Sequence, residues 1–390
     1  MKLSFENTKV AFKHKSDLEL KKSYSIFKAL KYPLIVNYGP KLANLLLKIR
    51  FPIKGIIKKT IFKQFCGGET IQESYHFAKK LYKDGIVAIL DYSVEGEGST
   101  ENFLETYNEL KLVITEASNN PEYPFAVFKC SGIGPFSVLA KKASNSELTE
   151  EDEESYNQFA ERFNELCQLA SDHHVKLLID AEETWIQNTI DDLVYDNSQS
   201  FNQEEIVVYN TIQMYRKGRI KEIKKQIDCA REKGYKLGFK LVRGAYMEKE
   251  IKRAVELGYS NPIQDSKEAT DQDYDAALRL CFEHRDIVSI MAGTHNEKSS
   301  LLFAQLIEDH QLDNADDRFW FAQLYGMSDH ISYNLAYEGY NVAKYLPYGP
   351  VKEVLPYLSR RAQENSSVKG QSSRELSLIK QELKRRKTLK

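Results

Sequence analysis

Polar and charged residues stand at or near the C-terminal ends of a series of apolar runs. They are Lys129, Asp180, Asn210, Lys240, Arg243, Thr294, His295, Asn296, Tyr325 and Tyr345. A charge inside an apolar run is costly to bury unless a partner or a ligand compensates it. One interpretation is structural, with Lys129 and Asp180 forming one satisfied ion pair. The other is a reactive site, and for that pair alone the sequence leaves both open.

A second charged group follows the last apolar run, in PYGPVKEVLPYLSRRAQEN at 347–365. Pro350 suits the first turn of a helix. Such a helix would bring four side chains to one face at i, i+3, i+4 and i+7, namely Tyr357, Arg360, Arg361 and Glu364. Paired guanidinium groups suit capture of a carboxylate. The alternative is a solvated ion pair between Arg360 and Glu364.

Several other chemistries lack their motifs. GIGPFS at 132–137 lacks the third glycine of a dinucleotide loop, so we expect a turn there. The sequence has no Walker A motif and no GxSxG elbow. The five cysteines form no CxxC pair and no His pair has helical ligand spacing, so no metal site is expected. The cations near 240 and the Thr-His-Asn at 294–296 therefore favour an anionic cofactor.

The apolar runs that carry these residues predict eight strands. Their ranges are 85–92, 124–132, 175–182, 206–213, 236–246, 287–296, 319–327 and 341–349. They do not alternate strictly, as is typical of parallel strands buried on both faces. Helical stretches lie between them at 157–171, 219–234, 272–284 and 298–310. The pattern predicts an α/β fold, a (βα)8 TIM barrel with reactive residues at the C-terminal ends of its strands.

Charge divides the chain into three segments, although the net charge is only −1. Residues 20–68 contain eleven basic residues and no acidic one, and Leu42, Leu45, Leu46 and Ile49 recur at helical spacing. We expect a basic N-terminal helical segment at 1–68, an acidic barrel at 69–365 and a loosely ordered basic C-terminal tail at 366–390. Such an acidic barrel argues against nucleic acid as the main partner.

The N-terminus lacks the apolar run of a signal peptide, and the scattered cysteines fit a reducing compartment. The longest apolar stretch, 42–57, is interrupted by Lys48, Arg50 and Lys54, so no membrane span is expected. We expect a cytoplasmic protein.

Five motifs, in order along the chain, resemble the proline dehydrogenase family. They are IDAEE at 179–183, KLVRGAYMEKE at 240–250, THNEKS at 294–299, QLYGM at 323–327 and, with Tyr345, RRxxEN at 360–365. Members of this family are flavoenzymes that oxidise proline to pyrroline-5-carboxylate on a distorted (βα)8 barrel. The resemblance runs from Lys129 to Asn365.

The resemblance implies two sets of site residues. The substrate cage should be Lys129, Asp180, Leu324, Tyr345, Arg360 and Arg361. The FAD site should include Asn210, Gln213, Lys240, Val242, Arg243, Gly244, Ala245, Thr294, His295, Asn296 and Glu364. By this resemblance the two arginines hold the proline carboxylate, Lys129 adds charge near it and Tyr345 packs against the ring. Lys240 is expected near flavin N5, where it could stabilise charge on the reduced flavin.

Two positions depart from part of the family. Bifunctional bacterial members have Arg and Gln where this chain has Lys240 and Asn210. The KLVRGAYM sequence is similar to monofunctional and mitochondrial members instead.

The resemblance as a whole implies FAD-dependent oxidation of L-proline by hydride transfer to flavin N5, with electrons passed to a membrane quinone.

Three alternative functions fit these residues less well. Hydroxyproline is the alternative substrate, which the bulk of Tyr345 disfavours. A flavin-free proline-sensing or scaffold barrel would not need the costly cluster of cations. A folate-reducing flavoenzyme would not need Arg360 and Arg361, which suit a small amino-acid carboxylate.

The basic segment at 20–68 has two interpretations. An acid-free amphipathic segment suits an anionic membrane surface, which would place the protein peripherally on the inner face of the membrane. Alternatively the segment packs on the acidic barrel and neutralises it. The sequence leaves both open.

Overall fold

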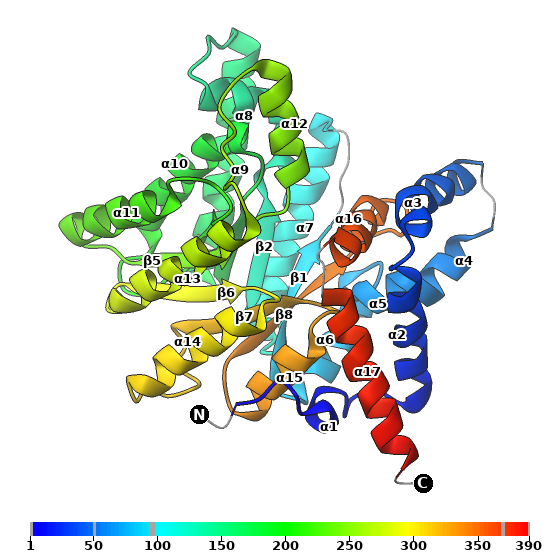
Figure 1. Cartoon of the computed structure of the whole chain (residues 1–390). Helices are drawn as coiled ribbons and strands as arrows, with labels where there is room; N and C mark the ends of the chain where they lie inside the picture. Colours follow the sequence, from blue (N-terminus) through cyan, green and yellow to red (C-terminus); the bar gives the residue numbers. More distant parts are fainter. Residues whose placement is uncertain (1–2, 50–51, 94–97, 368–370, 389–390) are drawn as a thin grey trace. The chain divides into compact units, whose positions relative to one another are not determined.

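The computed structural model describes residues 3–49, 52–93, 98–367 and 371–388. The side chains at 33, 37, 40, 41, 44, 47, 48 and 363–372 are outside this description. The chain divides into two compact units, whose helices and strands are labelled in Figure 1. Unit 1 combines residues 1–95 with 323–390, and unit 2 comprises residues 96–322.

Eight parallel strands in chain order close a barrel, which confirms the predicted fold class. They are β1 (Ile86–Tyr92), β2 (Phe125–Lys129), β3 (Lys176–Asp180), β4 (Val208–Gln213), β5 (Leu237–Val242), β6 (Val288–Gly293), β7 (Phe319–Leu324) and β8 (Val342–Tyr348). Most of the predicted runs overshoot the strands at their C-terminal ends. There the chain turns into loops, and after Lys129 it enters a short 3-10 helix, η2 (Cys130–Gly132).

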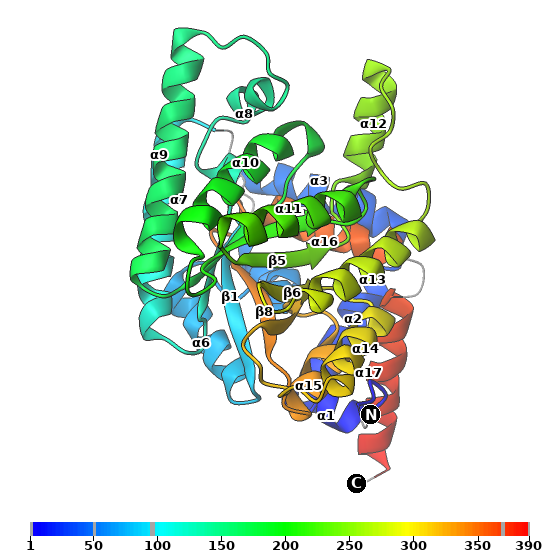
Figure 2. The same ribbon diagram turned by 90° about the vertical axis from the view of Figure 1, so that its left-hand side faces the viewer.

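Unit 2 covers β2 to β6 with long helices. They are α7 (Thr100–Asn119), α8 (Phe136–Ala143), α9 (Glu150–Asp172), α10 (Thr184–Phe201), α11 (Arg219–Lys233), α12 (Met247–Leu257), α13 (Lys267–Glu283) and α14 (Glu297–Asp309). Helices α7 and α9 lie side by side (Figure 2). The turn predicted at 132–137 is shorter than expected, because Pro135 already serves as the N-cap of α8.

Unit 1 contains the N- and C-terminal helices. They are α1 (Thr8–Ala11), α2 (Asp17–Ala29), α3 (Pro33–Lys48), α4 (Lys54–Ile57), the π-helical turn η1 (Lys58–Phe62), α5 (Lys63–Phe65), α6 (Ile71–Tyr82), α15 (Asp329–Tyr337), α16 (Leu355–Ser367) and α17 (Gln371–Lys387). The helices predicted across residues 20–68 are therefore present in the described part of that segment.

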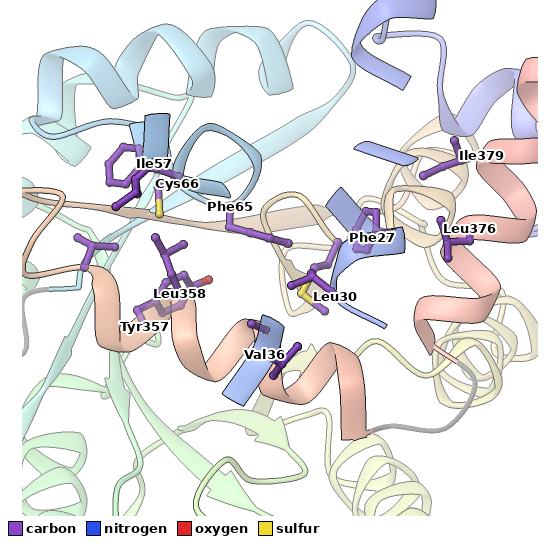
Figure 3. Packing of buried hydrophobic residues seen from close by; sticks show 14 of the residues in the cluster. Phe27, Leu30, Val36, Ile57, Phe65, Cys66, Tyr357, Leu358, Leu376 and Ile379 are labelled. Atoms are coloured by element: carbon purple, nitrogen blue, oxygen red, sulfur yellow. The ribbon is translucent and has the colours of Figure 1, made fainter. Parts of the chain in front are cut away.

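One apolar cluster joins the N-terminal helices of unit 1 to α16 and α17. Phe27, Leu30 and Phe65 pack in it with Leu358 and Ile379 (Figure 3). Because the helix at 371–387 buries apolar side chains in this cluster, the expectation of a loosely ordered tail is wrong for those residues. Residues 368–370 and 389–390, also within the expected tail, lie outside the described residues.

Candidate active site

Three predicted site residues of unit 2 lie on β2, β3 and β5. Lys129 and Asp180 are the last residues of β2 and β3, and they are register partners in the parallel ladder. The Asp180 carboxylate forms an ion pair with the ammonium group of Lys240 from β5, whose side chain is buried. The structure thus places an expected substrate residue, Asp180, directly against an expected flavin residue, Lys240.

A buried carboxylate that is not among the predicted site residues, that of Glu182, lies two residues beyond Asp180. Glu182 accepts hydrogen bonds from the backbone N–H of Ser131, at 2.9 Å, and from the Ser131 hydroxyl. Burial raises the pKa of Glu182 to about 7, although the Ser131 hydrogen bonds and the charge of Lys129 act in the opposite direction. The sequence feature that points to Glu182 is its position in the IDAEE motif, two residues after Asp180.

Two expected flavin residues on β4 carry buried oxygen atoms that can accept hydrogen bonds. The Asn210 side-chain amide donates to Asp191 Oδ1 at 2.9 Å. Asn210 Oδ1 and Gln213 Oε1 have no hydrogen-bond partner among the residues that the structure describes. A buried acceptor without a donor is costly, so such atoms suit a ligand that brings an N–H group, as the flavin ring does. Gln213 shares the strand face of Thr211, the register partner of Lys240, so its oxygen fits the cofactor, whereas the Asn210 side chain faces α10.

Arg243 fastens the start of α14. Its guanidinium group donates to Asp271 (2.5 Å), Thr294 Oγ1 (2.6 Å) and Ser299 Oγ (3.0 Å). Asn296 is the N-cap of α14, and its Oδ1 accepts from the backbone N–H of Ser299 at 3.3 Å. The predicted group at 294–296 thus precedes a 13-residue helix; Thr294 is buried, and His295 and Asn296 are half-buried. Such a terminus favours anionic groups such as phosphate.

The chain after β5 requires a glycine. Gly244 has a φ of +130°, and a Cβ there would lie 2.5 Å from the ring of Tyr215. The carbonyls of Val242 and Arg243 accept from the backbone of residues 214 and 215, at 2.8 and 2.7 Å. Gly244 and Ala245 are exposed, so their backbone is accessible to a ligand.

The remaining predicted residues lie in unit 1. Tyr345 is buried in β8, and its carbonyl accepts from Tyr325 N at 2.8 Å. Leu324, the last residue of β7, is half-buried.

The two arginines lie on α16, which begins at Leu355. Pro350 is therefore not in its first turn, which corrects the prediction; Pro350 instead accepts from Val354 N in a preceding turn, at 3.1 Å. Arg361 is buried with its guanidinium 5.1 Å from the centre of the Tyr357 ring, while Arg360 is half-buried. The side chain of Glu364 lies outside the described residues, as does the alternative pair with Arg360.

Among the residues that the structure describes, no group of three or more His, Cys, Asp or Glu side chains could hold a metal ion.

Comparison with known proteins identifies the family. The family model described as proline dehydrogenase matches residues 75–374. The chain belongs to the proline dehydrogenase family. It is 33% identical over 431 residues to the mitochondrial proline dehydrogenase 1 of Dictyostelium discoideum, covering 99% of this chain and 75% of that protein. The human mitochondrial proline dehydrogenase 1 is 41% identical over 244 residues, which cover 62% of this chain and 41% of that protein.

Two further relatives show the range of the family. The carbapenem antibiotics biosynthesis protein CarD of Pectobacterium carotovorum is 34% identical over 322 residues, covering 83% of each chain. Among solved structures, proline utilization A (PutA) from Bdellovibrio bacteriovorus superposes with a TM-score of 0.74 at 19% identity. That match covers 94% of this chain and 42% of the PutA chain, so this chain spans less than half of that protein and the match shows the fold alone.

Proposed function

We propose that this proline dehydrogenase family member catalyses the FAD-dependent oxidation of L-proline to 1-pyrroline-5-carboxylate, the first step of proline catabolism. The observation that carries the proposal is the part-buried ion pair between Asp180, the last residue of β3, and Lys240, two residues before the end of β5. It joins a residue expected at the substrate to one expected at the flavin, at the end of the strands where such barrels react.

The substrate is recognised through its carboxylate and its small apolar ring. Arg360 and Arg361 offer guanidinium groups that can bind a carboxylate in a bidentate way, and Lys129 adds a third positive charge. Tyr345 and Leu324 supply apolar surface for the ring. A clamped carboxylate fixes which face of the ring is presented, which converts binding into orientation.

The cofactor would be held by residues from β4, β5 and the start of α14. Gln213 would accept a hydrogen bond from it, Lys240 would stabilise negative charge on it, and Arg243 with the N-terminus of α14 would offer positive charge to its phosphates. The residues at 242, 244 and 245 offer backbone contacts, and Glu364 completes the proposed set. When bound, FAD supplies the hydride acceptor, N5, for the hydrogen on the proline C5 atom.

An arginine substitution tests the carboxylate assignment. Arg360→Met should raise KM for proline about tenfold or more, because one of the two guanidinium groups is lost. Flavin content, read from the absorbance of the purified protein, should stay near that of the unaltered chain. Loss of flavin with an unchanged KM would contradict the assignment.

An inactivator gives a second test. The PutA from Bdellovibrio bacteriovorus is inactivated by N-propargylglycine. We expect the same compound to inactivate this chain and proline to protect against it. A flavin-free sensor or scaffold, the alternative from another class, would show neither flavin absorbance nor inactivation.

Hydroxyproline is the alternative substrate. Tyr345 is a large ring held in β8 with only 8% of its surface exposed, so it cannot easily yield room for a ring hydroxyl. Proline should therefore show the higher kcat/KM when the two substrates are compared on the same preparation. A higher value for hydroxyproline would reassign the substrate.

We further propose that electrons pass to a membrane quinone from a protein bound peripherally to the membrane. None of the described helices is long and apolar enough to cross a membrane. Helix α3 instead presents an outward apolar face, formed by Leu34, Ile35, Tyr38, Leu42 and Leu45 and continued by Ile49. Each of these side chains is between 48% and 74% exposed. At 3.6 residues per turn they fall within an arc of about 100°.

The opposite side of α3 is already packed. Val36 is buried in the unit 1 cluster, and Ala43 packs against that cluster. The basic segment thus packs within unit 1 and still exposes an apolar face on α3. No acidic residue occurs between positions 20 and 68, so this face suits an anionic lipid surface.

Vesicle sedimentation tests this docking. Leu42→Ser with Leu45→Ser should abolish binding to vesicles of anionic phospholipid. The matched control is Leu104→Ser with Leu112→Ser on α7, where Leu112 is 56% exposed, the same fraction as Leu42 and Leu45. Equal binding by both double variants, or equal binding of the unaltered chain to neutral vesicles, would contradict the proposal.

A further inference from the structure

Glu182 links the loop after β2 to the end of β3. Ser131, its partner, lies two residues after Lys129, and Glu182 lies two residues after Asp180. Since Lys129 and Asp180 are register partners, the hydrogen bonds between Ser131 and Glu182 continue the β2–β3 pairing beyond the strands. These bonds lie two residues beyond the two side chains expected to face the substrate.

The backbone of Glu182 is held from the other side. Its N–H donates to Gln187 Oε1 at 2.8 Å, and the Gln187 amide donates to Asp191 Oδ1 at 3.0 Å. The same Asp191 oxygen accepts from Asn210 of β4. Gln187 and Asn210 are 1% exposed, so the connection is shielded from water. A continuous hydrogen-bonded chain thus runs from Ser131 after β2 to Asn210 on β4, all within unit 2.

The charges around Glu182 give its carboxylate a second role. Lys129 attracts the charged form of Glu182, and the neighbouring Glu183 repels it. Cys130 also interacts with Glu182, but burial raises the pKa of this thiol well above its usual value, so it remains neutral. The charged carboxylate therefore accepts both Ser131 donors and attracts the Lys129 ammonium.

We propose that Glu182 is a positioning residue for substrate binding: its charged carboxylate, held by both donors of Ser131, fixes the strand ends that present Lys129 and Asp180 to the substrate. The inference rests on the proposed function, because it assigns Lys129 and Asp180 to the substrate site. When Glu182 binds a proton, its attraction for Lys129 is lost and one oxygen becomes a hydrogen-bond donor. Substrate binding should then weaken.

Two variants separate the charge from the hydrogen bonds. Glu182→Gln keeps the shape and one acceptor oxygen but removes the titration. Ser131→Ala keeps the charge and removes one donor, so protonation of Glu182 should occur at higher pH. Glu165→Gln, at a carboxylate that accepts from Tyr107 on the outer helices, is the matched control.

The main readout is calorimetric Kd for a five-membered-ring carboxylate that lacks the amine, measured through the neutral pH range. Such a probe avoids titration of the proline amine. The unaltered chain and Glu165→Gln should bind it more tightly as the pH rises through neutrality. Glu182→Gln should bind it several-fold more weakly with no such pH step, and Ser131→Ala should show the step at higher pH. KM for proline should follow Kd, while kcat changes less.

Unchanged Kd and an unchanged pH step in Glu182→Gln would overturn the role of Glu182 and leave the proposed function standing. Glu182→Gln could also lose binding only because it misfolds, which flavin content and thermal unfolding would show. If Ser131→Ala then folds correctly and has the Kd and pH step of the unaltered chain, the role of Glu182 is likewise overturned. If the unaltered chain neither binds the probe nor oxidises proline, the proposed function falls, and this inference falls with it.

Discussion

At the scale of single residues, the site depends on charges buried in pairs. Lys240 is 4% exposed and is compensated by Asp180, whose side chain is 18% exposed. A buried ion pair is a weak source of stability when intact, yet removing one partner leaves a charge in an environment that cannot solvate it. The pair is therefore easily explained by function, since two apolar residues would hold the strands at least as well.

Removing one charge of this pair should be more damaging than removing both. Asp180→Asn should lower the free energy of unfolding by about 3 kcal/mol, because the buried Lys240 loses the charge of the carboxylate that pairs with it. Adding Lys240→Met to that variant should recover much of the loss. Urea unfolding of the single and double variants provides the test, and an equal or larger loss in the double variant would contradict the account.

The pH dependence of stability follows from Glu182. Its pKa is about 7 in the folded protein against 4.5 as the ordinary value, so the folded state binds more protons between these two pH values. The contribution of Glu182 to the free energy of unfolding therefore falls as pH rises from 4.5 to about 7 and is constant above that range.

Glu182→Gln should remove this fall in the free energy of unfolding with rising pH. Relative to the unaltered chain, the variant should gain up to about 3 kcal/mol between about pH 5 and about pH 8, the equivalent of the shift in pKa. Urea unfolding at the two pH values measures it. A stability difference between variant and unaltered chain that is the same at both pH values would show that this carboxyl is not perturbed.

At the scale of elements, the turn after β7 contacts the N-terminal helices of unit 1 through Gln64. Gly326, just after β7, has a φ of +77°, and a Cβ there would lie 1.9 Å from the carbonyl oxygen of Gln64. The Gln64 side chain donates to the Gly326 carbonyl at 2.9 Å and accepts from Ser23 of α2 at 3.0 Å. This turn has space only for a glycine.

A matched pair of glycines separates crowding from backbone strain. Gly339 has a φ of +84° with open space around its Cβ position, so Gly339→Ala should cost about 1 kcal/mol. Gly326→Ala must also displace the backbone of Gln64 and should cost clearly more. Thermal or urea unfolding compares the two variants, and similar losses in both would show that the contact with Gln64 is not constraining.

Helix α17 supplies a further prediction at this scale. Ile379 is 1% exposed within the unit 1 cluster, and its neighbour Lys380 is exposed. Ile379→Ala should lower the free energy of unfolding by about 3 kcal/mol, whereas Lys380→Ala should change it by less than about 0.5 kcal/mol. Small effects from both would mean that the C-terminal helix does not contribute to the core.

At the scale of the whole molecule, the sequence predicted the barrel well because its strands are buried on both faces. Runs such as 237–242 are apolar apart from Lys240, so both the strand and the candidate site residue could be recognised in the sequence. The C-terminal helix could not be recognised in the same way, because charged and polar residues alternate with its buried Leu376, Leu378 and Ile379. Only tertiary packing shows which of those residues face a core.

The site shows the same division. Strand ends located Lys129, Asp180 and Lys240, but the sequence could not show that Asp180 pairs with the cation from β5. It also gave no reason to separate Glu182 from its acidic neighbour, because the difference lies in the Ser131 hydrogen bonds. Such partners come from other strands, and no local pattern encodes them.

The central claim concerns the whole protein as a flavoenzyme that oxidises proline. The most direct measurement is an anaerobic titration of the purified full chain with L-proline, followed by the absorbance of the oxidised flavin. The account predicts that the protein carries flavin and that proline bleaches its absorbance, with pyrroline-5-carboxylate formed in equal amount. A protein without flavin, or a bound flavin that proline leaves oxidised, would contradict it.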